Sequence, residues 1–183
     1  MSNNIRIIMT LYQFEDSTPI LGEDSYVAST AEVIGDVKIG NNCYIGPGAK
    51  IRGDYGRIRI GNRTSIQENC VLHAGPDQVA IIGDNVTIGH GAIVYGPTIH
   101  NNVIIGMGAI VNDHAVIHDW CLIAAGSLVT GKQIIQEESL VVGVPAKFVR
   151  KISKTNHTLI EFSANLYAEL APRYLAGLKK LAE

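Results

Sequence analysis

Along most of the chain, a large aliphatic residue returns at every sixth position. A helix would repeat its apolar residues about every 3.6 positions and a half-buried strand every two, so neither element alone explains a step of six. Such a step is typical of a turn-and-strand unit used three times in each coil of a parallel β-helix. The pattern therefore predicts an all-β fold. The aliphatic positions are Val27, Val33, Ile39, Ile45, Ile51, Ile60, Ile66, Leu72, Ile82, Ile88, Val94, Ile99, Ile105, Val111, Ile117, Ile123 and Val129.

A second series, of compact residues, follows the first series at a distance of four positions. In a narrow triangular prism the large aliphatic residue fills the centre of a flat face, and the compact residue lies near a corner, where there is little room. At a strand spacing of about 4.8 Å, about six coils predict a prism about 29 Å long. The compact positions are Ala31, Val37, Cys43, Ala49, Thr64, Cys70, Val86, Ala92, Thr98, Val103, Ala109, Ala115, Cys121 and Ser127.

All three cysteines of the chain fall in this compact series. Their spacing matches no CxxC metal or redox motif, and the sequence gives no sign of secretion that would favour a disulfide. We therefore expect Cys43, Cys70 and Cys121 to be small buried hydrophobic residues.

The chain divides into three parts. Residues 1–24 are expected to form an N-terminal strand and loop that cap the first coil. Residues 25–150 carry the hexapeptide-repeat β-helix. Residues 157–183 place apolar residues at spacings of three and four, which predicts an amphipathic C-terminal helix along the prism or against a neighbouring subunit. Pro172 threatens a kink in this helix.

Composition and charge narrow the possible functions. A unit of 183 residues with 46% hydrophobic residues can fill a sizeable core, and its 19 glycines indicate many tight corners. The formal net charge is -2 and only 17% of residues are charged, so no basic surface favours nucleic acid or anionic lipid. The apolar run at residues 5–11 is too short to span a bilayer and has no small-residue cleavage site. We therefore expect a cytoplasmic protein that binds no membrane.

The candidate chemistry lies in the middle coils, at His73, His90 and Tyr95. Both His73 and Tyr95 directly follow an aliphatic residue, and they are 22 positions apart, which is one 18-residue coil plus a four-residue loop at 75–78. These two residues should therefore stack on neighbouring coils. His90 belongs to the preceding face, up to about 16 Å of extended chain from Tyr95. One chain cannot easily join all three, whereas a trimer can, if the edge with His73 and Tyr95 meets the neighbour's edge with His90.

Over nearly its whole length the chain resembles the γ-class carbonic anhydrases and their close relatives among the hexapeptide-repeat proteins. The hexad alone is shared with many acyltransferases, but an ordered set of motifs is more specific. The resemblance implies a left-handed parallel β-helix and a homotrimer in which three histidines, two from one chain and one from the next, bind zinc or a similar ion. The motifs are Arg52-Gly53-Asp54, Ser65-Ile66-Gln67, Val71-Leu72-His73, Ile88-Gly89-His90-Gly91-Ala92, Gly106-Met107-Gly108 and Val144-Pro145-Ala146-Lys147.

His73 and His90 match two of the family's three metal-binding histidines, and Tyr95 stands at the position of the third. The resemblance implies reversible hydration of CO2, a small-molecule substrate, with zinc or another divalent metal as cofactor. A catalytic zinc normally keeps three protein ligands, so the loss of one histidine would weaken metal binding. We expect Tyr95 to lower this activity for the same reason.

The resemblance also gives catalytic roles to Arg52, Asp54 and Gln67. It places Arg52 and Asp54 in an ion pair near the subunit interface, and Gln67 close to the metal-bound water. Without the resemblance, an Arg-x-Asp pair on a corner is more often solvated or structural, and Gln67 could merely bond a turn. Tyr167 on the final helix is a candidate to approach the site. The remaining histidines match no family ligand and are expected on the surface, namely His100, His114, His118 and His157.

Two other classes of function stay open. Relatives with this architecture include acyl-CoA thioesterases and acyltransferases, in which a cleft between prisms takes the pantetheine arm. Such an enzyme would show saturable acyl-CoA binding. The other class is a non-catalytic trimeric scaffold that has lost a ligand, and it would carry no stoichiometric metal.

Overall fold

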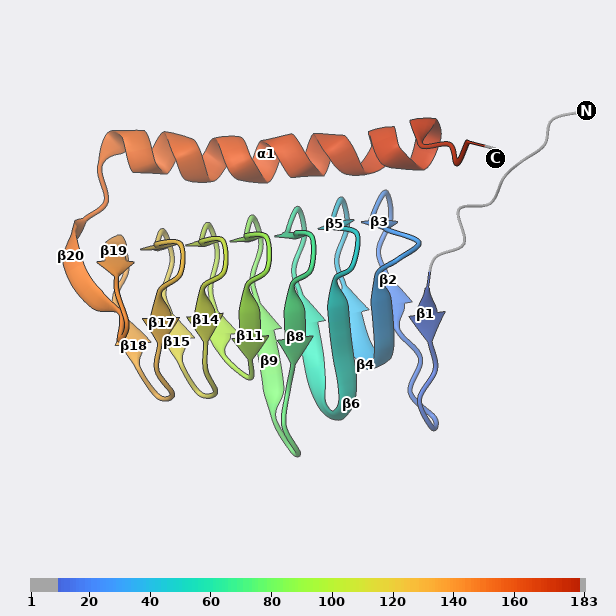
Figure 1. Cartoon of the computed structure of the whole chain (residues 1–183), viewed down its shortest axis with the longest axis horizontal. Coiled ribbons are helices and arrows are strands. Elements are labelled where there is room, and N and C mark those ends of the chain that lie inside the picture. The colour runs from blue at the N-terminus through green and yellow to red at the C-terminus, as the bar shows by residue number, and fades with distance from the viewer. Residues whose placement is uncertain (1–9, 182–183) are drawn as a thin grey trace, which may run out of the picture.

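The computed structural model describes residues 10–181, which form a prism of stacked β-strands with one long helix laid along it (Figure 1). The fold class expected from the sequence, a parallel β-helix followed by a C-terminal helix, is confirmed. The strands in the described residues are β1 (Leu11–Tyr12), β2 (Ile20–Leu21), β3 (Tyr26–Val27), β4 (Glu32–Ile39), β5 (Tyr44–Ile45), β6 (Lys50–Ile60), β7 (Ser65–Ile66), β8 (Val71–His73), β9 (Val79–Ile82), β10 (Thr87–Ile88), β11 (Ile93–Tyr95), β12 (Thr98–Ile99), β13 (Ile104–Ile105), β14 (Ile110–Val111), β15 (Val116–Ile117), β16 (Leu122–Ile123), β17 (Leu128–Val129), β18 (Ile134–Ile135), β19 (Ser139–Val142) and β20 (Lys147–Lys151).

The prism has three faces, and each coil adds one strand to each face. The front face begins with β1, then the N-terminal halves of β4 and β6, and continues with β8, β11, β14 and β17. The back face begins with β2, then the C-terminal halves of β4 and β6, and continues with β9, β12, β15 and β18. The helix face consists of β3, β5, β7, β10, β13, β16 and β19, all parallel, and the antiparallel β20 closes it.

The core is built from the aliphatic series, whose members are all buried. The helix face shows seven coils, one more than the six expected, because Ile135 and Val141 continue the series and are only 4% and 1% exposed. One compact position was predicted wrongly. Thr98 is partly exposed because it precedes the inward-facing Ile99 on β12, so its side chain lies on the opposite surface of the strand.

The three cysteines are free and buried, as the sequence predicted. The thiols of Cys43 and Cys70 donate hydrogen bonds across one coil to the carbonyls of Gly61 and Gly89, at 3.0 and 3.1 Å. Burial raises the pKa of each thiol from 9.0 to about 11, so the thiols stay protonated at neutral pH. These residues are therefore packing groups and not nucleophiles.

A ladder of side-chain hydrogen bonds runs along the corner between the back face and the helix face. Each side-chain oxygen of the ladder accepts a bond from a backbone N–H of the preceding coil, at 2.6 to 2.9 Å. The ladder thus satisfies turn amides that the parallel strands leave unpaired. Its members are Asn41, Asn62, Asp84, Asn101 and Asp119.

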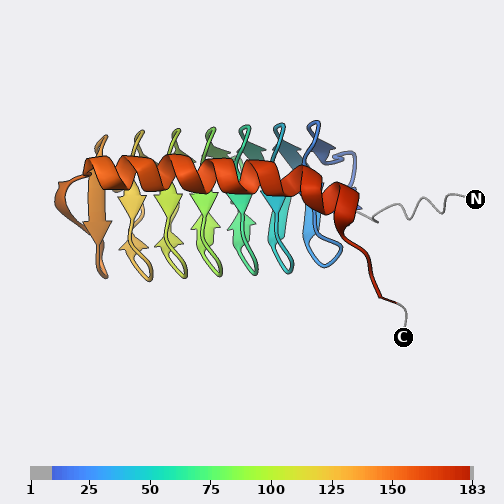
Figure 2. The ribbon, with the colours of Figure 1, turned by 90° about the horizontal axis from the view of Figure 1, so that it is seen from above.

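The helix α1 (Lys154–Gly177) lies along the helix face (Figure 2). It buries Ile160 and three alanines that allow close approach to β3, β5, β7 and β10. It begins three residues before the expected position 157 because Ser153 forms a capping box with Asn156. It ends at Gly177, earlier than the expected 183, at the residue with the weakest helix propensity apart from proline. The helix continues through Pro172.

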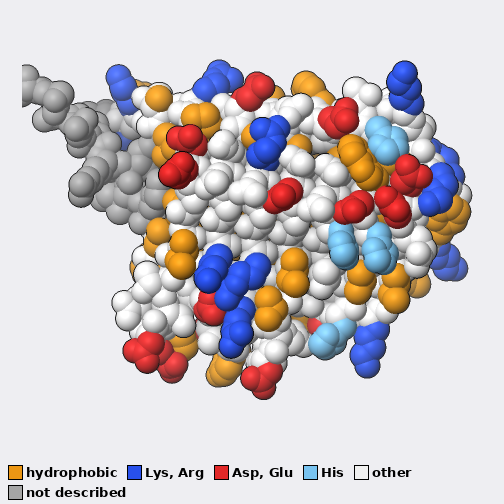
Figure 3. All heavy atoms as spheres, turned by 180° about the vertical axis from the view of Figure 1, so that it is seen from behind, with side chains coloured by type: hydrophobic (Ala, Val, Ile, Leu, Met, Phe, Trp, Pro, Cys, Tyr) orange, Lys and Arg blue, Asp and Glu red, His pale blue; other side chains and the backbone are white. Residues whose placement is uncertain are grey.

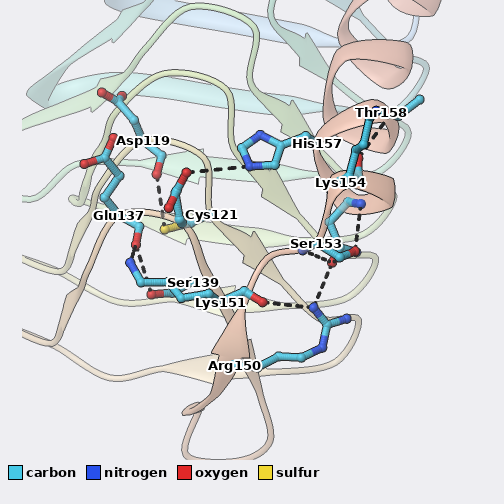
Figure 4. Close-up of polar contacts among 12 residues, drawn as sticks. Asp119, Cys121, Glu137, Ser139, Arg150, Lys151, Ser153, Lys154, His157 and Thr158 are labelled. Carbon is cyan, nitrogen blue, oxygen red and sulfur yellow. Dashed lines mark hydrogen bonds and ion pairs between the residues drawn. The ribbon is translucent and has the colours of Figure 1, made fainter.

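Polar contacts tie the start of α1 to the last coils of the prism (Figure 4). The ammonium group of Lys151 donates to the carbonyl oxygen of Glu137, and Nε2 of His157 lies 3.7 Å from Oε1 of Glu138. The His157 ring also packs on Trp120, with 4.7 Å between ring centroids. These contacts fix the direction in which the helix returns along the prism.

The first described residues cover the N-terminal end of the prism. Strands β1 and β2 both pair in parallel with β4. The expected cap at residues 1–24 lies partly outside the described residues, because the structure describes the chain only from residue 10. Between residues 10 and 181, no helix is both long and apolar enough to cross a membrane. The cytoplasmic location stays a prediction.

Candidate functional site

Three of the predicted site residues stack on successive coils of the front face. Arg52 pairs with His73 in the register of β6 and β8, and His73 pairs with Tyr95 in the register of β8 and β11. The rings of His73 and Tyr95 are 5.5 Å apart between centroids, with an interplanar angle of 51°. The stacking expected from the 22-residue spacing is therefore present at the edge between the front and back faces.

Asp54 links the predicted ion pair to His73. Its carboxylate forms an ion pair with Arg52, lies 3.1 Å from Nε2 of His73, and accepts the backbone N–H of Tyr55 at 2.9 Å. Burial acts to raise the pKa of Asp54, but the hydrogen bonds from Arg52, Tyr55 and His73 outweigh it and lower the pKa below its ordinary value. An ionised carboxylate is only an acceptor, so His73 donates from Nε2. Its Nδ1 has no hydrogen-bond partner in residues 10–181.

His90 lies on a different corner, between the helix face and the front face, where it follows β10. Its backbone N–H donates to Oε1 of the buried Gln67 at 3.2 Å. Its Nδ1 forms an ion-pair contact with Oε2 of Glu68. Gln67 is therefore beside His90, and Glu68 is a site residue that the sequence analysis missed.

Glu68 also connects His90 to the helix α1. The hydroxyl of the buried Tyr44 donates to Oε1 of Glu68 at 3.0 Å, and the ring of Tyr44 packs on Tyr167 with 5.2 Å between centroids. Burial, then the neighbouring charge of Glu68, raises the pKa of Tyr167. For Tyr44, burial is the first cause of a raised pKa and the hydrogen bond to Glu68 the second. Tyr167 thus packs on Tyr44, which is hydrogen-bonded to Glu68, the carboxylate beside His90.

The hydroxyl of Tyr95 is directed over the loop at 75–78 that the sequence predicted. A Cβ placed on Gly75 would lie only 2.7 Å from this hydroxyl, so glycine makes the close approach possible. Gln78 closes the loop by accepting the Gly75 N–H at 3.1 Å, and its amide nitrogen lies 3.1 Å from Nε2 of His114. The position that the resemblance gives to the third ligand therefore holds a phenol that packs against the loop.

The described residues at the candidate site could supply two histidine ligands to a metal, but not three. Each of His73 and His90 has one ring nitrogen on a carboxylate and the other without a partner in residues 10–181, which is the usual arrangement of a metal-binding histidine. The two lie on different corners, and within the described residues no three His, Cys, Asp or Glu side chains gather to hold a metal. A metal site built from both would need a second chain.

The chain is similar to known families and proteins. A family described as bacterial transferase hexapeptide (six repeats) matches residues 18–53 and 96–131. The carnitine operon protein CaiE of Proteus sp. (strain LE138) is 36% identical over 93% of this chain and 86% of its own length. The chain belongs to the γ-carbonic anhydrase-like hexapeptide-repeat family.

Members of this family with different names resemble the chain equally well. Gamma carbonic anhydrase 2, mitochondrial, of Arabidopsis thaliana is 38% identical over 88% of this chain, which spans 60% of the length of that plant protein. The crystal structure of a hexapeptide transferase family protein from Anaplasma phagocytophilum has a TM-score of 0.87 and 38% identity, over 90% of this chain and 98% of the other. Family membership alone therefore does not select between hydration and acyl transfer.

Proposed function

We propose that this protein is a γ-carbonic anhydrase-like enzyme that catalyses the reversible hydration of CO2 at a divalent metal, in the first place zinc, with an activity weakened by Tyr95. The observation that carries the proposal is the pair of carboxylate-held histidines, His73 with Asp54 and His90 with Glu68. The ring nitrogens of these two histidines lie within 3.1 Å of a carboxylate oxygen, whereas those of His114 and His157 are 3.7 Å from theirs. The plant relatives named as carbonic anhydrases support the same function.

The site requires a homotrimer, and the front face supplies a surface for it. The outward positions of this face in its middle and last coils are aliphatic, and two of them, Val71 and Ile93, are 40% and 43% exposed. One edge of the face carries His73 and the other edge carries His90. Three front faces turned toward a common axis would join each His73 edge to a neighbour's His90 edge in a closed ring. The aliphatic positions are Val71, Ile93, Ile110 and Leu128.

In this trimer His73 and the neighbour's His90 would hold the metal through the ring nitrogens that their carboxylates leave free. A divalent metal at such a site supplies a Lewis acid that makes water acidic enough to ionise near neutral pH. Asp54 keeps the proton of His73 on Nε2, and Arg52 keeps Asp54 ionised. Gln67 accepts from the His90 backbone, so its amide nitrogen, which has no partner within residues 10–181, can donate to an oxygen of the substrate.

Tyr95 departs from the three-histidine pattern of the family, and it is the reason to expect weak metal binding. A neutral imidazole offers a lone pair at once, whereas a phenol must lose its proton before it binds a metal. The Tyr95 hydroxyl also lies over Gly75, beyond the reach of an imidazole at the same position. The natural protein should therefore bind zinc more weakly than a three-histidine site.

The substitution Tyr95→His tests the function. It should raise zinc content and CO2 hydration together, and affinity should rise at least tenfold, since each tenfold step is about 1.4 kcal/mol and a lost ligand costs several. Metal analysis and stopped-flow hydration of the natural protein, Tyr95→His and the control Tyr95→Phe would measure both. A protein that takes up stoichiometric zinc without added hydration contradicts the anhydrase proposal, and light scattering near the 19.7 kDa of one chain contradicts the shared site.

One observation favours a second candidate. The similarity to a hexapeptide transferase family protein, at 38% identity, makes an acyl-CoA-dependent enzyme the alternative. Saturable binding of acetyl-CoA, together with unchanged hydration in Tyr95→His, would favour acyl transfer. The absence of both metal and acyl-CoA binding would favour a trimeric scaffold.

A further inference from the structure

A second pair of histidines lies away from the proposed site, at the corner between the back face and the helix face. His100 follows β12 and His118 follows β15, and these strands pair in parallel, so the two histidines stand on neighbouring coils. The N–H of His100 donates to the carbonyl of Ile117 at 2.8 Å, and the N–H of His118 to that of Ile135 at 3.0 Å. The backbone therefore holds the two side chains side by side.

The two rings are stacked and their nitrogens are free. Their centroids are 5.0 Å apart with an interplanar angle of 25°, and both residues are half-buried. In residues 10–181 neither ring has a hydrogen-bond or ion-pair partner, whereas each of the other four histidines of the chain contacts a carboxylate. His100 and His118 thus differ from the rest in offering two unoccupied imidazoles at one place.

The distance between the two ring centroids is compatible with a chelating pair, although their present orientation is stacked. With metal–nitrogen bonds of about 2.0–2.1 Å and ligand angles of about 90–110°, the centroids of two imidazoles on one ion lie about 4.5–5.2 Å apart. The observed 5.0 Å falls within this range. Because the rings are stacked, their nitrogen lone pairs run nearly parallel, so chelation requires both side chains to rotate about χ1 and χ2 until one nitrogen of each faces a common ion.

We infer that His100 and His118 form a bidentate site for a late first-row divalent ion such as Cu²⁺, Ni²⁺ or Zn²⁺. Imidazole ligands suit these ions, and affinity is greatest for Cu²⁺. The neighbouring coils place no further histidine beside the pair. The equivalent position on the coil before His100 is Gly83, and on the coil after His118 it is the exposed Gln136.

The site does not depend on the proposed function. It lies on the corner farthest from the front face, so the trimer proposed above leaves it accessible. Figure 3 shows the side of the molecule opposite to that of Figure 1, on which histidine and acidic side chains gather toward the C-terminal end of the prism. Acidic neighbours such as Asp119 favour the approach of a cation.

Copper binding to the full-length protein tests the inference. Titration calorimetry with Cu²⁺ should be done on a His73→Ala/His90→Ala background, to remove the other histidine pair, with electron paramagnetic resonance to count coordinated nitrogens. One Cu²⁺ per chain with two nitrogen ligands is expected, and His100→Ala or His118→Ala should each weaken binding at least tenfold.

The control His114→Ala, which removes an exposed histidine outside the pair, should leave copper binding unchanged. His100→Gln and His118→Gln repeat the test with side chains that keep more of the packing, and circular dichroism checks that each variant is folded. Copper binding that survives the loss of both His100 and His118, or no binding in the background protein, would overturn the inference.

Discussion

The role of Glu68 can be tested by replacing it with alanine. Its two carboxylate oxygens serve different partners, since Oε1 accepts the Tyr44 hydroxyl and Oε2 contacts Nδ1 of His90. If Glu68 holds the His90 ring, its loss should affect metal binding. If it satisfies the buried Tyr44, its loss should affect stability as well.

The structure gives separate expected magnitudes for the effect of Glu68→Ala on stability and for its effect on zinc affinity. The side chains of Glu68 and His90 are 33% and 47% exposed, so their ion pair contributes only about 0–1 kcal/mol to stability. Tyr44 is 2% exposed, and leaving its hydroxyl unpaired costs about 1–3 kcal/mol. Glu68→Ala should therefore lower the free energy of unfolding by about 1–3 kcal/mol, mainly through Tyr44. It should also weaken zinc binding about 10–100-fold, the usual effect of losing a residue that orients a ligand.

Both effects can be measured in the same set of variants. Urea unfolding at fixed protomer concentration gives stability, because assembly makes stability concentration-dependent. Competition with a chromophoric chelator gives zinc affinity, most clearly in the Tyr95→His protein. The double variant Glu68→Ala/Tyr44→Phe should lose less stability than the sum of the single variants, since Phe leaves no hydroxyl to satisfy.

The control is Glu169→Ala, which removes an exposed carboxylate of α1 and should change neither quantity. Unchanged zinc affinity with reduced stability would show that Glu68 supports only Tyr44. Unchanged stability and affinity together would refute the reasoning.

Two further predictions concern the prism. The thiol pKa values, raised by burial from 9.0 to about 11, mean that the unfolded chain loses thiol protons first as pH rises. The contribution of the protonated thiols to the free energy of unfolding is then fully present below about pH 9. It declines toward pH 11, by up to about 2–3 kcal/mol per thiol. Urea unfolding of the triple Cys→Ala variant should show a flatter decline, and an equal decline would contradict the assignment. Asn62→Ala, which removes the acceptor for the Asn41 N–H at 2.9 Å, should cost about 1 kcal/mol in the same assay, against the control Glu169→Ala. A loss no larger than that of Glu169→Ala would show that the ladder adds nothing.

The fold could be predicted because six residues make one side of the coil. The repeat therefore gives the three-sided cross-section of the prism directly. Each inward aliphatic residue has one place in a coil, so a break in the series marks an insertion or a bend. The step from Ile51 to Ile60 is such a break, and in the structure it is spanned by the single long strand β6, with no loop. The burial of Thr98 was predicted wrongly because a step of five instead of six changes which residues face inward. Spacing alone does not show at which corner the coil is one residue shorter.

The candidate site was only half predictable for a similar reason. Register along one face predicted that His73 and Tyr95 stack, since both follow an inward residue. Glu68 was missed because a single carboxylate at a corner resembles any solvated turn residue. Its place directly after Gln67, one coil before His90, was the available signal. The carbonyl of Glu68 accepts the N–H of Gly91 at 2.9 Å, which holds the two neighbouring turns of this corner together.

The position of Tyr95 shows why this fold supports several chemistries. The inward neighbour Val94 is 1% exposed and holds the coil in place, whereas Tyr95 at the end of β11 points out of the prism and packs on Gly75. Replacing an outward residue at a strand end changes no core contact, so the scaffold accepts histidine or tyrosine there at little cost in stability. Stability and function are thus encoded in alternate positions of the same strand. Under the proposed function a metal ligand could be lost or restored at position 95 without a change of fold, so the chemistry would be decided by the outward residues at the corners.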